Sequence, residues 1–309
     1  MESFSQSPNA IFMVRPSHFG HNHQTAGSNR FQGIISSDWK DISVQARLEF
    51  DGLQSKLLMA GIKSFVFEES NPDTPDAIFP NNWISFHSNG EIVIYPMMAE
   101  NRRLEKRKDI IAEIEKSFEV DSIFDISFYE KEHKFLEGTG SIIFDYKNKV
   151  AYANRSPRTH DDLFYLTCRE LSFEPVLFTA TDPNMIDIYH TNVLMALADD
   201  FCVICTQSIA PIHRDLVKKK LLETNHEIID ITFEQMGNFV GNMIQLSNDQ
   251  GDRFMVMSAA ALNSLTKPQL KIIERYAGII HSDLETIETV GGGSARCMIA
   301  GIFLPEKNA

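Results

Sequence analysis

The chain has 309 residues, of which 43% are hydrophobic and 23% are charged, so it is long enough to bury a sizeable core. Its 29 lysines and arginines are outnumbered by 42 aspartates and glutamates, which gives a formal net charge of −13. This balance disfavours nucleic acid and anionic membranes as partners, because both carry negative charge. Small molecules or cationic groups fit it better.

Neither a secretory signal nor a membrane span is expected. The first residues carry Glu2 and no basic cluster before an apolar run, and no stretch reaches the roughly 18 consecutive apolar residues that a span needs. Four scattered cysteines predict a reduced, cytoplasmic protein. Cys202 and Cys205 have no second Cys or His pair of suitable spacing, so both are interpreted as core cysteines and no metal site is expected.

The N-terminal part is predicted to form a strand, a helix and a second strand. Residues 10–16 are a short apolar run that ends at a proline. After a stretch rich in His and Asn, apolar residues recur at helical spacing over residues 41–60, and Gly61 ends this helix. Residues 62–68 are predicted to form the next strand.

The remainder of the chain repeats one pattern. Each unit opens with a polar or glycine-rich loop, continues as two apolar strands joined by a turn, and mostly proceeds into a helix. Equivalent positions at these openings are separated by 55, 53, 52 and 55 residues, and they are Asn82, Glu137, His190, Asn242 and Cys297. A near-constant period of this size indicates a repeat architecture.

The predicted strand pairs are 83–87 with 91–95, 141–144 with 149–153, 193–198 with 201–205, and 243–246 with 253–258. The predicted helices are 101–118, 159–171, 212–223 and 267–277. Units of this ββαβ type predict a pseudo-symmetric α/β propeller in which the opening loops converge on a central axis. Residues 1–309 are expected to form a single domain of this kind.

Cys297 lies just after three consecutive glycines, residues 291–293. Such a run is typical of a chain that folds tightly or lets a ligand approach its backbone. By itself this stretch also fits a flexible loop and a buried core thiol. The repeat, however, would bring Cys297 together with His190 and Glu137. A thiol, an imidazole and a carboxylate are the components of covalent catalysis by a thiolate, and Asn82 and Asn192 would join them.

Three motifs in this order resemble the pentein fold of guanidino-group modifying enzymes, which includes arginine deiminases, dimethylarginine hydrolases, amidinotransferases and succinylarginine dihydrolase. Residues 136–140 resemble their acidic Glu-Gly-Gly-Asp loop, residues 189–194 their His-x-Asp strand opening, and residues 291–297 their closing glycine-rich cysteine motif. Residues 14–16, 19–20 and 24–25 further resemble a branch of citrulline-utilising hydrolases. The fold class implied is a five-fold α/β propeller around a central active-site channel.

The resemblance implies roles for these residues. Cys297 would be the nucleophile, its thiolate stabilised by protonated His190 or by backbone N–H groups of the glycine loop. His190 would transfer protons and Glu137 would orient it. Arg158 would bind the carboxylate of an amino-acid substrate, with Arg15 as a second candidate. No cofactor or metal is implied, and a homodimer is compatible with the sequence.

Two departures from the family pattern bear on the substrate. Asn82 and Asn192 stand where the deiminases carry aspartates that hold a cationic guanidinium. An amide offers a donor and an acceptor without charge, which suits the neutral ureido group of citrulline. Asp76 is interpreted either as a solvated loop acid or as a residue that restores a negative charge. Hydrolysis of arginine or a substituted arginine, amidino transfer, and a catalytically inactive binding scaffold are the alternatives.

Overall fold

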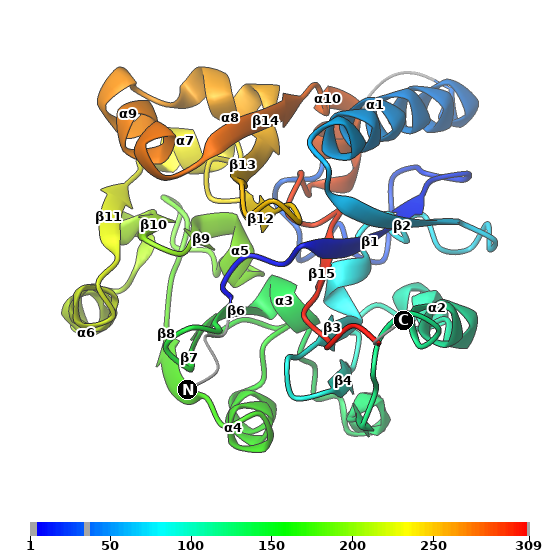
Figure 1. Cartoon of the computed structure of the whole chain (residues 1–309), viewed down its shortest axis with the longest axis horizontal. Coiled ribbons are helices and arrows are strands. Elements are labelled where there is room, and N and C mark those ends of the chain that lie inside the picture. The colour runs from blue at the N-terminus through cyan, green and yellow to red at the C-terminus, as the bar shows by residue number, and fades with distance from the viewer. Residues whose placement is uncertain (1–4, 34–37, 308–309) are drawn as a thin grey trace.

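The computed structural model describes residues 5–33 and 38–307. Five three-stranded β-sheets surround a central axis, and most helices lie on the outside (Figure 1). In every sheet an inner strand pairs antiparallel with a middle strand, which in turn pairs parallel with an outer strand. The predicted α/β class and the five-fold repeat are therefore confirmed.

Given as inner, middle and outer strand, the sheets are β3 (Ile84–Phe86), β4 (Glu91–Ile94), β5 (Ser122–Asp125); β6 (Ile142–Asp145), β7 (Val150–Asn154), β8 (Glu174–Phe178); β9 (Met195–Leu197), β10 (Phe201–Ile204), β11 (Glu227–Asp230); β12 (Ile244–Ser247), β13 (Arg253–Ser258), β14 (Gly278–Ser282); and β15 (Ala300–Ile302), β1 (Ala10–Arg15), β2 (Lys63–Glu68). The fifth sheet joins distant parts of the chain, because Ile11 of β1 lies opposite Gly301 of β15. This pairing closes the circle.

The longer helices are α1 (Trp39–Met59), α4 (Asp161–Glu170), α6 (Pro211–Glu223) and α9 (Lys267–Tyr276). The shorter ones are α2 (Lys108–Ile114), α3 (Gly138–Ser141), α5 (Thr191–Leu194), α7 (Phe233–Gly237), α8 (Ala259–Ser264) and α10 (Glu285–Gly291), with 3₁₀ turns η1 (Pro80–Asn82), η2 (Asn101–Glu105), η3 (Ser127–Glu132) and η4 (Thr206–Ser208). Local chemistry explains several starts. At α9, for example, Thr266 and Gln269 form a capping box that satisfies two backbone N–H groups.

The prediction of one helix over 101–118 was wrong. The segment divides into η2 and α2, and Lys106 and Arg107 between them are extended, with ψ of 105° and 112°. The physical reason is the side chain of Arg102, which is buried and pairs with Glu105 in the interior of the protein. Nε of Arg102 lies 2.9 Å from Oε1 of Glu105.

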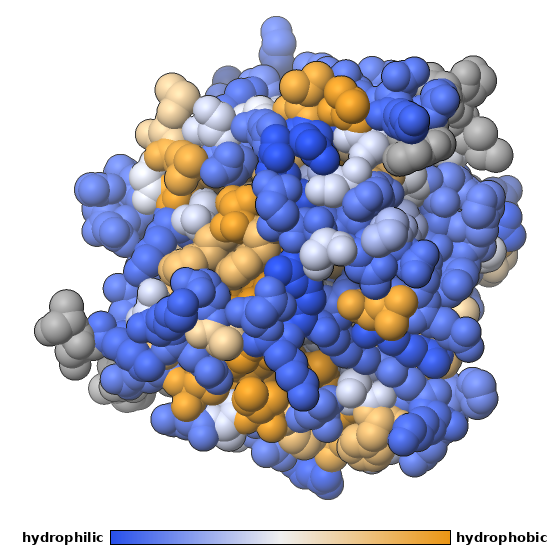
Figure 2. Space-filling model, turned by 90° about the vertical axis from the view of Figure 1, so that its right-hand side faces the viewer, coloured by the Kyte–Doolittle hydropathy of each residue, from blue (hydrophilic) through white to orange (hydrophobic). Residues whose placement is uncertain are grey.

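Apolar side chains fill the space between the sheets and the helices that cover them. Phe50, Leu53 and Leu57 of α1, for example, are fully buried and belong to the same cluster as Ile11 and Met13 of β1. On the side of the molecule in Figure 2, hydrophobic residues form small groups among hydrophilic ones. None of the helices in the described residues is both long and apolar enough to cross a membrane.

Cys202 in β10 and Cys205 directly after it follow the prediction of core cysteines. Cys202 and Cys205 are buried, form no disulfide, and lie within the core. Within residues 5–33 and 38–307, no group of three or more His, Cys, Asp or Glu side chains is arranged to hold a metal ion.

Candidate active site

Short turns that precede the inner strands carry the candidate site residues. Asn82 ends η1 before β3, Glu137 caps α3 before β6, and His190 caps α5 before β9. Asn242 precedes β12 and Cys297 precedes β15. Because the inner strands surround the axis, these turns converge at one end of it. The turns of Asn82, His190 and Cys297 contribute to a pocket with about 250 Å³ of space, part of it open to solvent, and its lining residues are Asn29, Asp76, Phe79, Asn82, Arg102, Arg158, Tyr189, His190, Gly291, Gly292, Gly293 and Cys297. Glu137, Asn192 and Asn242 are buried and are not among these lining residues.

The thiol of Cys297 is 3% exposed and receives hydrogen bonds from two side-chain amides. Nδ2 of Asn242 lies 3.2 Å from Sγ, and Nδ2 of Asn192 lies 3.4 Å from it. Asn242 also donates to the backbone oxygen of Asn192 at 2.9 Å. The expected backbone N–H donors of the glycine loop are thus replaced by amides from the third and fourth repeats.

The glycines before Cys297 are explained by packing against an aromatic ring. A Cβ at Gly291 would lie 2.7 Å from Cζ of Phe79, and one at Gly293 would lie 2.9 Å from Cε1 of the same ring. Gly292 has φ of +64°, a left-handed conformation that L side chains rarely adopt. Any larger residue would push the loop, and with it Cys297, away from Phe79.

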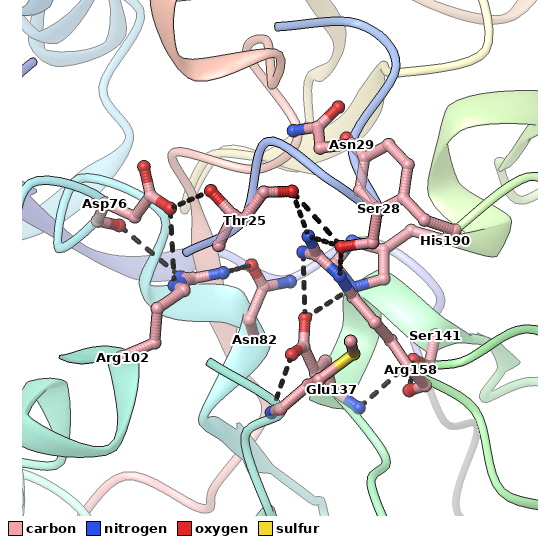
Figure 3. Close-up of polar contacts among 12 residues, drawn as sticks. Thr25, Ser28, Asn29, Asp76, Asn82, Arg102, Glu137, Ser141, Arg158 and His190 are labelled. Carbon is pink, nitrogen blue, oxygen red and sulfur yellow. Dashed lines mark hydrogen bonds and ion pairs between the residues drawn. The ribbon is translucent and has the colours of Figure 1, made fainter. Parts of the chain in front are cut away.

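Glu137 and His190 form a buried pair, since Oε2 of Glu137 lies 2.8 Å from Nε2 of His190 (Figure 3). Burial raises the pKa of Glu137, but the charge of Arg158 and the hydrogen bond from His190 outweigh it and hold that pKa well below its usual range. Burial lowers the pKa of His190 to about 4, because the positive charges of Arg158 and Arg102 offset the attraction of Glu137. At neutral pH the imidazole is therefore uncharged, and the proton on Nε2 faces the carboxylate, which leaves Nδ1 as the basic nitrogen.

Arg158 lies beside this pair and is 2% exposed. Its Nη1 is 3.3 Å from Oε2 of Glu137 and its Nη2 is 2.6 Å from Oγ of Ser28 (Figure 3). Its guanidinium carbon lies 4.9 Å from the ring centre of Tyr189. The His- and Asn-rich stretch after β1 thus supplies a wall of the pocket, as Asn29 also lines it.

Arg15, the second predicted carboxylate ligand, does not line the pocket. Its guanidinium makes two hydrogen bonds to Asp51, at 2.7 and 2.6 Å, and a weaker one to Glu68. The reason is its place at the end of β1, where its side chain meets α1 and β2. The structure therefore places one of the two predicted arginines at the site.

Arg102 is a pocket residue that the sequence did not reveal, because it stands in a highly charged stretch typical of a solvated helix. Its Nη1 donates to Oδ1 of Asn82 at 2.8 Å (Figure 3). Its Nε and Nη2 each donate to the carboxylate of Glu105 at 2.9 Å. Asp76 lies 3.9 Å from Nε of Arg102 and accepts a hydrogen bond from Asn22 at 2.7 Å. Asp76 is 3% exposed, so the interpretation as a solvated loop acid was wrong.

Solved structures share this architecture. One is the N-terminal domain of ArgZ, an arginine dihydrolase of cyanobacteria, solved covalently bound to a reaction intermediate. It has a TM-score of 0.75 at 15% identity, and the match covers 96% of this chain and 98% of the ArgZ domain. Unliganded AgrE has a TM-score of 0.75 at 16% identity, over 97% of this chain but 40% of AgrE. A dimethylarginine dimethylaminohydrolase in an adduct with S-methyl-L-thiocitrulline has a TM-score of 0.64 at 16% identity. This match covers 95% of this chain and 99% of that protein. No curated protein sequence matched the chain.

Together, the fold and the family match define a hydrolase of carbon–nitrogen bonds within the pentein superfamily of guanidino-group modifying enzymes. The chain belongs to the family described as "N,N dimethylarginine dimethylhydrolase, eukaryotic", which it matches over residues 15–304.

Proposed function

We propose that this enzyme hydrolyses the ureido group of citrulline, giving ornithine, carbon dioxide and ammonia, within a single catalytic domain. The observation that carries the proposal is a pair of buried amide atoms without partners. Nδ2 of Asn82 and Oδ1 of Asn192 have no hydrogen-bond partner in the described residues. Asn82 lines the pocket, and Asn192 adjoins it through Nδ2, which lies 3.4 Å from Sγ of the pocket residue Cys297. A buried polar atom without a partner costs about 1–3 kcal/mol, so a ligand that pairs with both gains binding energy.

The orientation of Asn82 makes this pair informative. Its Oδ1 accepts from Arg102, so Nδ2 points to the side on which His190 and Arg158 lie (Figure 3). Turning the amide over would place an N–H donor against the donors of Arg102. A ureido group has a carbonyl oxygen for Asn82 and N–H groups for Asn192. A guanidinium has only donors, so it would leave Nδ2 of Asn82 unpaired.

In the proposed mechanism the thiolate of Cys297 attacks the ureido carbon, and the two amide N–H groups on Sγ stabilise its negative charge. Neutral His190 accepts the thiol proton and delivers it to the departing δ-nitrogen of ornithine as that C–N bond breaks. Water then attacks the S-carbamoyl carbon, His190 takes its proton, and the C–S bond breaks. The carbamic acid released decomposes to carbon dioxide and ammonia. Glu137 orients His190 throughout, and Arg158 binds the substrate carboxylate.

The second candidate is a hydrolase of arginine or a substituted arginine. It is favoured by the family. Oδ1 of Asp76, which lines the pocket, is a buried carboxylate oxygen without a hydrogen-bond partner among the described residues. A guanidinium would pair with it. The α-ammonium group of citrulline would do so equally, and therefore Asp76 alone does not favour either substrate.

The test supplies purified protein with citrulline, arginine and N-methylated arginines, and follows ornithine, ammonia and released methylamines. We expect citrulline to have the highest kcat/KM, and Cys297→Ala to abolish turnover. Turnover of an arginine but not of citrulline would eliminate the ureido proposal, and full activity of Cys297→Ala would eliminate the nucleophile.

Asn192→Asp should lower kcat/KM for citrulline by about 5- to 150-fold, the equivalent of about 1–3 kcal/mol. Unchanged kcat/KM would remove Asn192 from the site.

A further inference from the structure

A second cavity lies farther along the same axis than the Cys297 pocket. It has about 600 Å³ of space that no atom occupies, part of it open to solvent, and every inner strand contributes to its wall, with Ile84, Ile143, Leu197, Gln245 and Ala300. Each of these residues follows the site residue of its own repeat along the chain. The two cavities thus occupy successive positions on one axis, and nothing in the proposed reaction uses the second.

The second cavity contains one positive charge and no negative one. Arg296 is the single ionised side chain among its lining residues, and Tyr146, its phenolic neighbour, has a pKa raised by burial. Among the described residues, the guanidinium donates one hydrogen bond, from Nη1 to the backbone oxygen of Ile299 at 2.9 Å. Arg102 and Arg158, by comparison, are paired with Glu105 and Glu137. No carboxylate of residues 5–33 or 38–307 forms an ion pair with Arg296 in this way. Burial lowers the pKa of Arg296, as expected for a cation without a counter-ion.

Gln245 provides an unpartnered donor in the same wall. Its side chain is 2% exposed, and its Oε1 accepts from Oγ of Ser7 at 2.8 Å and from the backbone N–H of Asp199 at 2.9 Å. These two donors fix the orientation of the amide. Its Nε2 is buried and has no hydrogen-bond partner among the described atoms. Such a group is stabilised by an acceptor that comes from outside.

Apolar side chains form most of the remaining wall, including Ile84, Ile143, Leu197, Met243 and Phe303. We propose that this cavity is a binding site for a small organic carboxylate with a short apolar chain. The carboxylate oxygens accept from the guanidinium of Arg296 and from Nε2 of Gln245. The apolar chain lies against the aliphatic wall, where its removal from water contributes to affinity.

The position of Arg296 in the chain links the two cavities. Its neighbour Cys297 lines the first cavity, whereas Arg296 itself lines the second. The proposed ligand therefore binds one residue away from the nucleophile without entering the pocket that holds it.

Isothermal titration of the full-length protein tests the site, with butyrate as the probe in a buffer free of other carboxylates. Butyramide, butylamine and inorganic phosphate are titrated in parallel. We expect one butyrate per chain, bound at least about tenfold more tightly than each of the three comparison compounds. Arg296→Gln removes the charge and should weaken butyrate at least about tenfold. Arg275→Gln, at an exposed arginine paired with Glu227, should leave it unchanged.

A second variant, at Gln245, tests the same cavity in case Arg296→Gln does not fold. Gln245→Glu keeps the acceptor and the size of the side chain but places a negative charge in the cavity, so it should also weaken butyrate at least about tenfold. Equal binding of butyramide, equal binding of phosphate, or no binding of butyrate at up to about 20 mM would overturn the proposal. The proposal would also be overturned if the affinity for butyrate fell in Arg158→Gln but not in Arg296→Gln or Gln245→Glu, because butyrate would then occupy the Cys297 pocket.

Discussion

Asn242 donates a hydrogen bond from Nδ2 to Sγ of Cys297 at 3.2 Å, although 55 residues separate the two in the chain. The oxygen of the same amide accepts from the backbone N–H groups of Ser294 at 3.2 Å and of Cys297 at 3.4 Å. One side chain thus holds both the sulfur and the backbone turn that presents it.

Asn242→Ala should lower kcat/KM by about 10- to 100-fold, because it removes a donor from the sulfur and leaves the buried N–H of Ser294 unpaired. Asn242→Asp should have a larger effect, since a carboxylate beside Sγ opposes formation of the thiolate. The rate of Cys297 alkylation by iodoacetamide at neutral pH should fall in both variants. The exposed Asn238 is the matched control, and Asn238→Ala should alter neither quantity. Unchanged alkylation in Asn242→Asp would contradict this role.

Arg158 and Arg15 provide a contrast between a buried pocket residue and a partly exposed one. Arg158→Gln should raise KM at least about tenfold, because it removes the cation assigned to the substrate carboxylate. Arg15→Gln should leave KM unchanged and reduce the free energy of unfolding by about 0–1 kcal/mol, since its partner Asp51 is 39% exposed. Steady-state kinetics and urea unfolding of both variants measure these effects, and the opposite order of KM values would reverse the assignment.

The lowered pKa of His190 predicts that activity persists at pH values below the usual titration range of histidine. Because its pKa in the folded protein is about 4, the neutral base persists at pH 5, and kcat/KM should decline toward pH 4 rather than near pH 6.5. The unfolded chain binds more protons than the folded one between these values, so the free energy of unfolding decreases as pH falls through this window, by up to about 1.4 kcal/mol per pH unit.

The contribution of His190 to the pH dependence of the free energy of unfolding can be separated from the contributions of other titratable groups. His190→Gln should make the decrease between pH 6.5 and pH 5 smaller, whereas His281→Gln, at an exposed position, should leave it as in the native protein. Denaturant unfolding at several pH values measures the slopes. The same slope in native protein and His190→Gln would show that His190 titrates normally.

Gly140 lies where a side chain would strike the site directly. A Cβ there would be 2.8 Å from both Cε1 and Nδ1 of His190, and still nearer to Nδ2 of Asn82. Gly140→Ala should therefore displace these groups and lower kcat/KM by about 100-fold or more, with a loss of about 1–3 kcal/mol in unfolding free energy. Gly237→Ala is the control, because nothing lies within 4 Å of its Cβ and its effect should be neutral or stabilising. Full activity in Gly140→Ala would refute the steric argument.

Arg102 and Glu105 form a buried ion pair whose side chains are 3% and 1% exposed. Arg102→Met should reduce the free energy of unfolding by about 3–5 kcal/mol, since it leaves the charge of Glu105 uncompensated. Replacing both residues with Met should restore part of this loss. The surface pair of Lys116 and Glu113 is the comparison, and Lys116→Met should cost less than about 1 kcal/mol. Urea unfolding measures all three, and equal losses for the two single variants would contradict the buried-pair argument.

Local patterns in the sequence were sufficient to predict most strands, most helices and the five-fold repeat, because period-two and helical hydrophobic patterns report which face of an element is buried. The same period identified Asn82, Glu137, His190, Asn242 and Cys297 as equivalent positions. Their neighbourhood followed from symmetry, since equivalent turns of a closed repeat meet at its axis.

The particular contacts depended on tertiary structure. The family resemblance ranked Arg158 above Arg15, but the sequence could not show that Arg15 lies outside the pocket or that Arg102 lies in the interior. Burial of a long cationic side chain depends on where its carboxylate partner lies in space. The role of Asn242 beside the sulfur likewise required a distance. The chain by itself thus determined the repeat and the candidate residues. The tertiary structure decided which donors and charges lie near Cys297, because this depends on distances between side chains of different repeats.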